Sequence, residues 1–252
     1  MDRAGSRGIF KVYNDKELKN AIKSSKSISN SGNVIIEEYL DGPEVSVELV
    51  ISNKRVYVIQ VTDKVTTGPP HFIEIGHSQP SVLDCDAIAN IKDVAIRAAQ
   101  SLEINNCLGH AEIKLTSRGA KMIEIGARAG GDSIGEQLIL NSTGVNFQNI
   151  ALNFAVGNEV QIFEPIYSTP CCIRFIQGKS GILKSVKGVE NVKLSKNIIS
   201  LKITGKIGKK YSEPVDNSSR WGYVIAKANS VVEAKSICDK ALGEIVIEVS
   251  DD

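Results

Sequence analysis

The sequence predicts an α+β fold, in which antiparallel sheets with flanking helices are followed by a small β-rich lobe. Short β-prone runs separated by turn residues recur along the chain. Apolar residues recur at helical spacing over residues 84–102. After a linker over residues 158–170, which contains Pro165 and Pro170, the chain changes to short strands and turns. We therefore expect a body over residues 1–157 and a β-rich C-terminal lobe over residues 158–252 that packs on it.

Helices and strands alternate in the predicted body. Asn14 and Glu17 form a capping-box-like helix start, and Gly157 is a helix stop. A segment rich in Gly, Pro and His, residues 66–81, is expected to be irregular. In chain order the predicted elements are a strand from residue 9, a helix at 14–25, strands at 34–39, 44–52 and 55–62, a helix at 84–102, a β-hairpin around 116–120 and a helix at 147–156.

The predicted C-terminal lobe contains mostly strands. Ser230 with Glu233 marks the start of one helix, which ends near Gly243. The predicted strands lie at residues 171–176, 181–186, 198–203, 222–228 and 244–249.

Composition argues against several classes of protein. The 252 residues are 42% hydrophobic and 23% charged, with a net charge of +1, so nothing favours a nucleic-acid or membrane-surface binder. The apolar runs are too short to span a bilayer, and we find no secretory signal. The five cysteines lack metal-ligand spacing, and the Cys171-Cys172 pair is interpreted as core rather than redox. We expect a cytoplasmic protein.

Glu112 and Glu124 are the most informative residues, because each lies in a short alternating run on one side of a turn at 116–120. Carboxylates at equivalent places on adjacent antiparallel strands share one face, and a cation such as Mg²⁺ relieves their repulsion. Arg128 and Gly130-Gly131 follow, which suits phosphoryl or acyl-phosphate chemistry. A surface hairpin with solvated Glu and Lys side chains is the alternative.

A second group of residues could bind a nucleotide. The run at 34–44 is an apolar strand, the acid pair Glu37-Glu38, the hinge Tyr39-Leu40, and a Gly-Pro turn before Glu44. It offers an apolar slot for a base and carboxylates for its amino group and for ribose. The turn Gly5-Ser6-Arg7-Gly8 could hold phosphates with its amides, and Lys64 could reach a phosphate. Each feature alone also fits ordinary solvated surface.

The order of these motifs resembles the ATP-grasp superfamily. Within it, the chain is most similar to carboxylate–amine ligases of the L-amino-acid (dipeptide) ligase and biotin-carboxylase-like type. The segment at 72–81, which contains Glu74 and His77, and the run Gly130-Gly131-Asp132 resemble that subgroup in particular. The likeness extends over essentially the whole chain.

The resemblance implies roles for these residues. Glu37 and its neighbour Glu38, the Tyr39-Leu40 backbone and Glu44 would bind the adenosine of ATP. Residues Gly5, Ser6, Arg7 and Gly8 would form a lid over its phosphates, which Lys64 would contact. Glu112 and Glu124 would hold Mg²⁺, and Arg128 would stabilise charge on an acyl phosphate or its adduct. Glu74, His77, His110, Gly130 and Gly131 are candidates for binding the carboxylate and amine substrates.

The sequence departs from the family pattern in two places. Gly126 stands where the family usually has an Asn that binds metal, so one metal ligand would be missing or replaced by water. The Gly-rich turn also comes almost directly after Met1, whereas complete members carry a further α/β region before it. We therefore expect either an ATP-dependent ligase that forms a C–N bond, with a homodimer inferred by resemblance, or a nucleotide-binding module completed by another polypeptide. In a third alternative the hairpin is structural and binds neither ATP nor metal.

Overall fold

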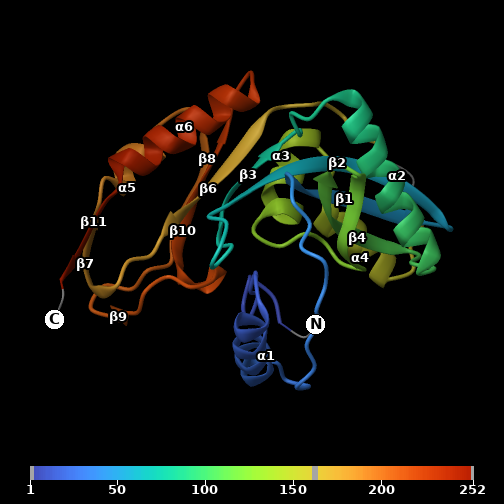
Figure 1. Cartoon of the computed structure of the whole chain (residues 1–252). Coiled ribbons are helices and arrows are strands. Elements are labelled where there is room, and N and C mark those ends of the chain that lie inside the picture. The colour runs from blue at the N-terminus through green and yellow to red at the C-terminus, as the bar shows by residue number, and fades with distance from the viewer. Residues whose placement is uncertain (1–2, 161–163, 251–252) are drawn as a thin grey trace.

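The computed structural model of the protein describes residues 3–160 and 164–250. An eight-stranded antiparallel sheet runs through both halves of the molecule (Figure 1), and a three-stranded sheet lies near the C-terminal end. The strands of the large sheet are, in spatial order, β5 (Gly119–Gly126), β4 (Cys107–Thr116), β1 (Glu44–Ser52), β2 (Arg55–Thr66), β3 (Glu74–Gln79), β6 (Cys171–Gln177), β10 (Arg220–Lys227) and β8 (Ile198–Ile203). The small sheet contains β11 (Val246–Ser250), β7 (Gly181–Lys187) and β9 (Lys210–Tyr211).

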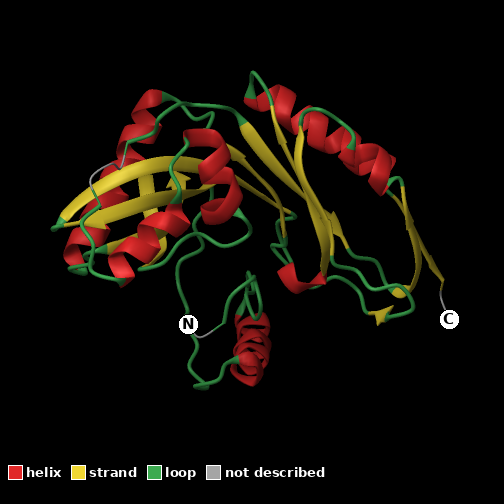
Figure 2. Cartoon of the chain, turned by 180° about the vertical axis from the view of Figure 1, so that it is seen from behind, coloured by secondary structure: helices red, strands yellow, loops and turns green. Residues whose placement is uncertain are grey.

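Helices cover the large sheet on both sides in the first half (Figures 1 and 2). On one side lies α2 (Cys85–Ser101), and on the other lie α3 (Ile139–Thr143) and α4 (Phe147–Ala155), which follow the π-helical turn η1 (Ile134–Leu138). In the second half α6 (Val231–Glu244) packs on β6 and β10, and α5 (Val189–Lys193) on β8; η2 (Asn217–Ser219) is one 3₁₀ turn. None of the helices among the described residues has the length and apolar character needed to cross a membrane.

The first helix, α1 (Asp15–Ile28), stands apart from the sheets. It has no buried residue, and both views show it below the place where the two halves of the large sheet meet (Figures 1 and 2). Asn14 caps it as predicted, because its side-chain oxygen accepts a hydrogen bond from the Glu17 N–H at 3.0 Å.

The two faces of β1 differ. Val45, Val47 and Leu49 point into an apolar core under α2. On the opposite face Val50 packs against α3 and α4. Nearer the start of the strand, the same face carries Ser46 and Glu48, which are also fully buried. The alternation of a strand thus gives β1 one wholly apolar face and one face with a polar end.

One sheet joins the two predicted lobes, because β3 from the first half pairs with β6 from the second. The division into two lobes at residue 157 stays a prediction. The structure adds that strands from before and after this residue are hydrogen-bonded to each other within a single sheet. The core of the second half lies between β6, β10 and α6 and includes Trp221, Val224 and Ala234.

The predicted α+β class is confirmed, and most elements lie where the patterns place them. The strands predicted at 44–52 and 198–203 have the observed bounds. Asp84 caps α2, Ser230 caps α6, and Gly157, with φ +77°, follows the end of α4. These ends are local, since each depends on a hydrogen bond or dihedral within a few residues.

Three element predictions are wrong. Residues 9–12 and 34–39 form no strand, although both runs are apolar, because neither pairs with a strand of either sheet. Ile9, Phe10 and Ile36 are instead exposed. The segment 66–81 is not irregular throughout, since it contains β3. Strand formation depends on a partner distant in sequence, and composition alone does not identify that partner.

Candidate active site

Lys64, near the end of β2, lies at the centre of a group of carboxylates. Its Nζ is 2.8 Å from an oxygen of Glu44, 2.8 Å from one of Glu74 and 2.9 Å from Oε1 of Glu112, and its side chain is only 3% exposed. Burial alone would lower the pKa of Lys64, but the attraction of Glu74, Glu112 and Glu44 outweighs it and raises the pKa far above its usual value. The lysine therefore stays charged and neutralises part of this cluster.

Glu112 lies beside a buried histidine. Its Oε1 is 3.3 Å from His110 Nε2, and His110 Nδ1 makes a very short contact with Glu48 on β1. Burial opposes ionisation of Glu112, yet hydrogen bonds from His110 and Lys64 hold its pKa at about 2. Both contacts use Oε1, and among the described residues none contacts Oε2. The ionised Glu112 thus keeps one oxygen for a cation.

The predicted hairpin is present, and Glu112 and Glu124 are direct partners across it. Glu124 is much the more open of the two, with a side chain 58% exposed, and Arg128 lies 3.4 Å from it. Gly126 lies under Arg128, because a Cβ there would come within 3.3 Å of the arginine side chain. The two carboxylates and the guanidinium therefore lie together on, and just after, the two outermost strands at one end of the large sheet.

A second charged cluster adjoins the first through Glu74. Arg220 on β10 donates two hydrogen bonds to Asp132, at 2.6 and 3.0 Å, and its guanidinium carbon lies over the Phe175 ring, 3.9 Å from the centroid. His77 is fully buried, and neither ring nitrogen has a hydrogen-bond partner among the described residues. Its Nε2 is 3.8 Å from Glu74 and 3.9 Å from Asp132. Glu74, His77 and Asp132 bring one ligand atom each within 4.8 Å of one another.

The two carboxyl groups of this second cluster differ in their affinity for a proton. Burial, together with hydrogen bonding to Asp132, raises the pKa of Glu74. Burial also opposes ionisation of Asp132, but His77, Glu74 and the Arg220 guanidinium more than offset it, and the pKa of Asp132 lies well below its usual range. If the pair holds one proton, that proton belongs to Glu74.

A cavity of about 300 Å³ lies beside this second cluster. Asp132 and Arg220 form its charged side, and Phe175 and Tyr223 contribute rings. Since Lys64 links Glu74 to Glu112, this cavity is connected to the glutamate hairpin through a short chain of ion pairs.

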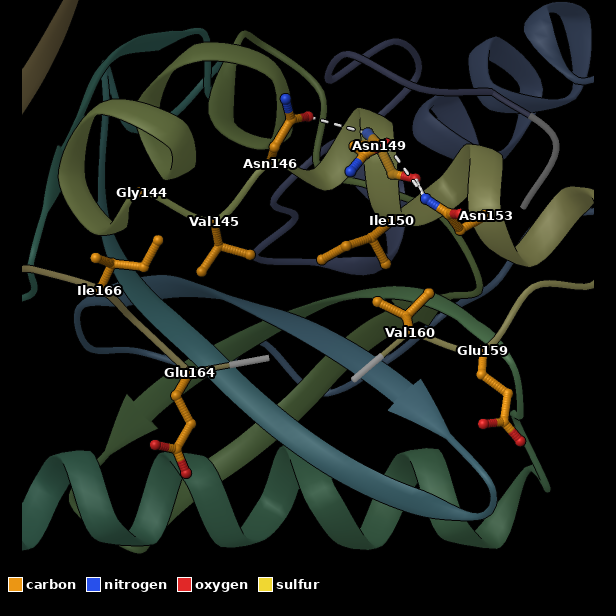
Figure 3. A pocket seen from close by; sticks show the side chains of 10 residues that line it. All are labelled: Gly144, Val145, Asn146, Asn149, Ile150, Asn153, Glu159, Val160, Glu164 and Ile166. Atoms are coloured by element: carbon orange, nitrogen blue, oxygen red, sulfur yellow. Dashed lines mark hydrogen bonds between the residues drawn. The ribbon is translucent and has the colours of Figure 1, made fainter. Parts of the chain in front are cut away.

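Another cavity, of about 400 Å³, lies elsewhere, and Figure 3 shows the side chains around it. None of the predicted site residues lines it. Its lining residues are Gly144, Val145, Asn146, Asn149, Ile150, Asn153, Glu159, Val160, Glu164 and Ile166.

The Gly-rich turn lies near the second cluster. The Ser6 hydroxyl donates to the Phe72 carbonyl at 2.9 Å, and the Gly5 carbonyl accepts from the Asn217 N–H at 3.1 Å. Asn217 in turn bonds Glu74 through both its side-chain oxygen and its amide nitrogen. The predicted lid is thus two hydrogen bonds away from the predicted substrate residue Glu74.

The predicted adenosine segment is extended and mostly exposed. Tyr39 lies near Phe72, with ring centroids 6.5 Å apart, and Lys11 is 3.6 Å from the Tyr39 centroid. Glu38 pairs with Arg118 of the hairpin turn. Glu44, by contrast, is paired with Lys64 and lies 3.5 Å from Lys114. Among the described residues no contact is recorded for the Glu37 carboxylate.

Four residues of the site were not predicted as site residues from the sequence: Glu48, Asp132, Asn217 and Arg220. Glu48 and Arg220 lie in ordinary strands, and their partners are 62 and 88 residues away in sequence. Asp132 follows the Gly130-Gly131 pair directly, which was the one available signal.

The chain belongs to the ATP-grasp family. The model of the ATP-grasp domain matches residues 1–137, and that of the L-amino acid ligase C-terminal domain 2 matches residues 174–250. Both agree with the resemblance predicted from the motifs. The crystal structure of the L-amino acid ligase from Bacillus licheniformis superimposes with a TM-score of 0.82 at 23% identity, over 95% of this chain and 60% of that one, which confirms the fold.

Two curated relatives show the extent of the likeness in sequence. The uncharacterized protein y4rH of Sinorhizobium fredii is 23% identical over 251 residues, which are 98% of this chain and 52% of that protein. Alanine–anticapsin ligase of Bacillus subtilis is 31% identical over 128 residues, 46% of this chain and 27% of that enzyme. The chain therefore spans about half the length of the first relative and about a quarter of the second.

Proposed function

We propose that this chain carries the site of an ATP- and Mg²⁺-dependent ligase that joins a carboxylate to an amine through an acyl phosphate. The observation that carries the proposal is the pairing of Glu112 and Glu124 across the hairpin, with Arg128 at its rim and Lys64 buried behind it. Membership of the ATP-grasp family and the ligases among its relatives support it.

The donor set of the hairpin fits Mg²⁺. Glu112 is ionised at neutral pH and keeps Oε2 for a cation, and Glu124 is an exposed carboxylate on the same face. Two carboxylates with the remaining positions taken by water and phosphate oxygens are a common Mg²⁺ arrangement. Bound there, the ion would neutralise phosphate charge. Gly126 supplies no side-chain ligand, which is consistent with a site that is completed by water.

Arg128 and Lys64 have different places in this proposal. The Arg128 guanidinium is half exposed and held at the metal side, where it can approach the acyl phosphate and stabilise developing charge. Lys64 is enclosed by three carboxylates, so its predicted phosphate contact requires that it release one of them. The positive charge of Lys64 nevertheless attracts an anion, such as a phosphate, that binds near Glu112.

Glu74, His77 and Asp132 would receive the amine substrate. Two carboxyl groups close to a buried imidazole that makes no hydrogen bond to any described residue suit an ammonium group. In its ionised form Glu74, whose pKa is raised, is suited to take the proton that the amine must lose before it attacks. The adjoining cavity, lined by Phe175 and Tyr223, has room for a side chain. These features support an amino-acid-like substrate.

A second candidate function is a nucleotide-binding module completed by a partner polypeptide. It is favoured by the exposed apolar residues of the segments around 9–13 and 35–39, which Lys11 connects by contacting Tyr13 and Tyr39. Apolar patches of this kind are typical of interaction surfaces. Under this alternative the chain binds ATP but turns over only with its partner.

Calorimetric titration with ATP, with and without Mg²⁺, tests the proposed site. We expect binding that needs Mg²⁺ and is lost in Glu112→Gln. The matched control is Glu248→Gln, which makes the same change in an exposed carboxylate of β11 that contacts Lys187. Mg²⁺-independent binding, or equal binding by Glu112→Gln, would show that the metal site is elsewhere.

Hydroxylamine then tests the reaction. A substrate carboxylate oxygen attacks the γ-phosphorus and ADP leaves; the hydroxylamine nitrogen attacks the acyl carbon, loses a proton and releases phosphate. We expect ATP-dependent hydroxamate with at least one amino acid offered as the acid. ATP binding without hydroxamate for any acid would favour the partner-dependent module.

A further inference from the structure

A buried carboxylate on β1, Glu48, has no role in the function proposed above. It is fully buried on the polar end of the strand and lies directly opposite His110 on β4. A carboxylate in such a position is costly unless its oxygens are hydrogen-bonded. The partners of Glu48 therefore indicate what it does.

Both oxygens of Glu48 contact parts of the candidate site. Oε1 contacts Nδ1 of His110, whose other ring nitrogen faces Glu112 at 3.3 Å. Oε2 accepts the Gly130 N–H at 3.1 Å. One side chain thus connects the glutamate expected to hold metal with the loop that follows β5.

The loop packs against this carboxylate so closely that a side chain at residue 130 would push it or His110 aside. A Cβ on Gly130 would lie 2.6 Å from Glu48 Oε1 and 2.9 Å from His110 Nδ1. Arg128 comes two residues before Gly130, and Asp132, which pairs with Arg220, comes two residues after it. Fixing Gly130 consequently fixes the segment that presents both charged side chains.

We propose that Glu48 is a positioning residue, which holds His110 against Glu112 and the Gly130 backbone against both, so that the metal glutamate and the 128–132 loop keep one mutual arrangement. This inference rests on the proposed metal-dependent function. Stability alone does not require a carboxylate on this face of β1, because the next side chain along the same face, Val50, is apolar and packs in a hydrophobic core. Outer partners of metal ligands commonly affect metal affinity in this way.

Mn²⁺ binding in the presence of ATP, followed by electron paramagnetic resonance on the full chain, tests the inference. In Glu48→Leu, His110 Nδ1 and the Gly130 N–H lose their acceptor, and we expect Mn²⁺ affinity to fall about 10- to 100-fold. Glu48→Gln keeps the shape of the side chain but has a single acceptor oxygen, which can serve the Gly130 N–H or His110, so we expect a loss smaller than that of Glu48→Leu.

A merely structural role would change stability and leave the metal affinity of the folded molecules unchanged. Val47→Ala is the control for this, because Val47 is equally buried one residue away but faces the α2 core. It should lower stability while leaving Mn²⁺ affinity unchanged. Equal Mn²⁺ affinity in Glu48→Leu and Val47→Ala would overturn the positioning role.

A second variant approaches the same contact from the loop, in case Glu48→Leu does not fold. Gly130→Ala places a methyl group against Glu48 and His110 and should also weaken Mn²⁺ binding about tenfold or more. Gly243→Ala, where a Cβ meets no atom within 4 Å, is its control. Unchanged affinity in Gly130→Ala would contradict the inference.

The wild-type titration separates failure of the inference from failure of the proposed function. A wild-type chain that binds no Mn²⁺ with ATP overturns the proposed site, and the inference with it. A wild-type chain that binds, together with Glu48 and Gly130 variants that bind equally well, overturns the inference alone.

Discussion

The two faces of strands β1 and β4 are both largely buried, but by different means. Under α2, the side chains are apolar and include Val47, Leu49 and Ile113. On the opposite face, towards one end of the same strands, lie Ser46, Glu48, His110 and Glu112. The backbone and the pairing register are shared, so the difference between the apolar face and the polar face lies in side-chain chemistry alone.

The contrast predicts how substitutions on each face change the stability of the protein. An apolar side chain that is truncated leaves a cavity, and the loss depends on how far the neighbours can relax. A charged group that is removed leaves its partners buried without compensation, which costs more than the pair contributed. The polar face should therefore be the more sensitive to a single change, and its sensitivity should depend on pH.

Removal of the Lys64 charge should give the largest effect. Lys64→Met leaves Glu44, Glu74 and Glu112 without their shared cation, so we expect a loss of about 3–5 kcal/mol in the free energy of unfolding, measured in urea near pH 8. Lys187→Met is the control: its pair with Glu248 is exposed on both sides, and its removal should cost about 0.5 kcal/mol or less.

The pH dependence of this loss gives a second check. Carboxylates left unpaired in the folded variant acquire a raised pKa and bind protons that the unfolded chain does not bind at the same pH. The folded state then gains stability as the pH falls, and the deficit of Lys64→Met should shrink between about pH 8 and pH 5. A deficit that is constant over this interval would mean that lost packing, rather than lost charge, is responsible.

Truncation on the apolar face should give a somewhat smaller and pH-independent effect. Leu49 is fully buried under α2, and we expect Leu49→Ala to lower the free energy of unfolding by about 3 kcal/mol. Mg²⁺–ATP binding by the folded protein should stay unchanged. A change in nucleotide affinity as large as that of a polar-face variant would show that the two faces are not independent.

His110 should make stability fall in alkali. Burial lowers the pKa of His110, but hydrogen bonds to Glu112 and Glu48 outweigh it and raise the pKa to about 9. The folded pKa exceeds the unfolded value, so this stabilisation is complete below about pH 6.5 and is lost as the pH rises through about 9. The loss should be on the order of 1–3 kcal/mol.

His110→Gln isolates this contribution. Urea unfolding of both proteins from about pH 6 to pH 10 should show the wild type losing its advantage over the variant across that interval. If the difference between the two proteins is the same at every pH, the histidine is not charged in the folded state.

The parts of the site that the sequence predicts are those set by short-range geometry. The hairpin that carries Glu112 and Glu124 was predictable because a tight turn at residues 117–118 joins its strands. That turn alone would place Ile123 opposite Glu112, and a register shift between Glu112 and Ile113 brings Glu124 opposite it instead. The start of α2 could be predicted for the same reason, because it is defined by Asp84 and by the first turn that Asp84 caps.

The rest depends on pairings that no local pattern specifies. In the sequence, Glu48 has the pattern of an ordinary strand residue, and its partner His110 is known only once β1 is paired with β4. Likewise, Arg220 has the pattern of a strand start, and its partner Asp132 is known only from the folded structure. The reverse error occurred at residues 34–39, where a strand-like composition met no partner strand. Propensity describes what a segment can do, while sheet order decides whether it does so.

Arg128 should give the smallest change in stability and still affect the reaction strongly. It lies at the open rim of the polar face, 51% exposed and 3.4 Å from the exposed Glu124, so Arg128→Ala should cost about 0.5 kcal/mol or less. If it stabilises charge on the acyl phosphate, hydroxamate formation should fall about 10²- to 10³-fold with little change in ATP affinity. Arg97→Ala is a close match, since Arg97 also pairs with an exposed carboxylate four residues away, Asp93, and it should leave turnover intact. Lower ATP affinity with normal turnover in Arg128→Ala would instead assign the guanidinium to nucleotide binding, and the polar face would then contribute to catalysis only through its buried members.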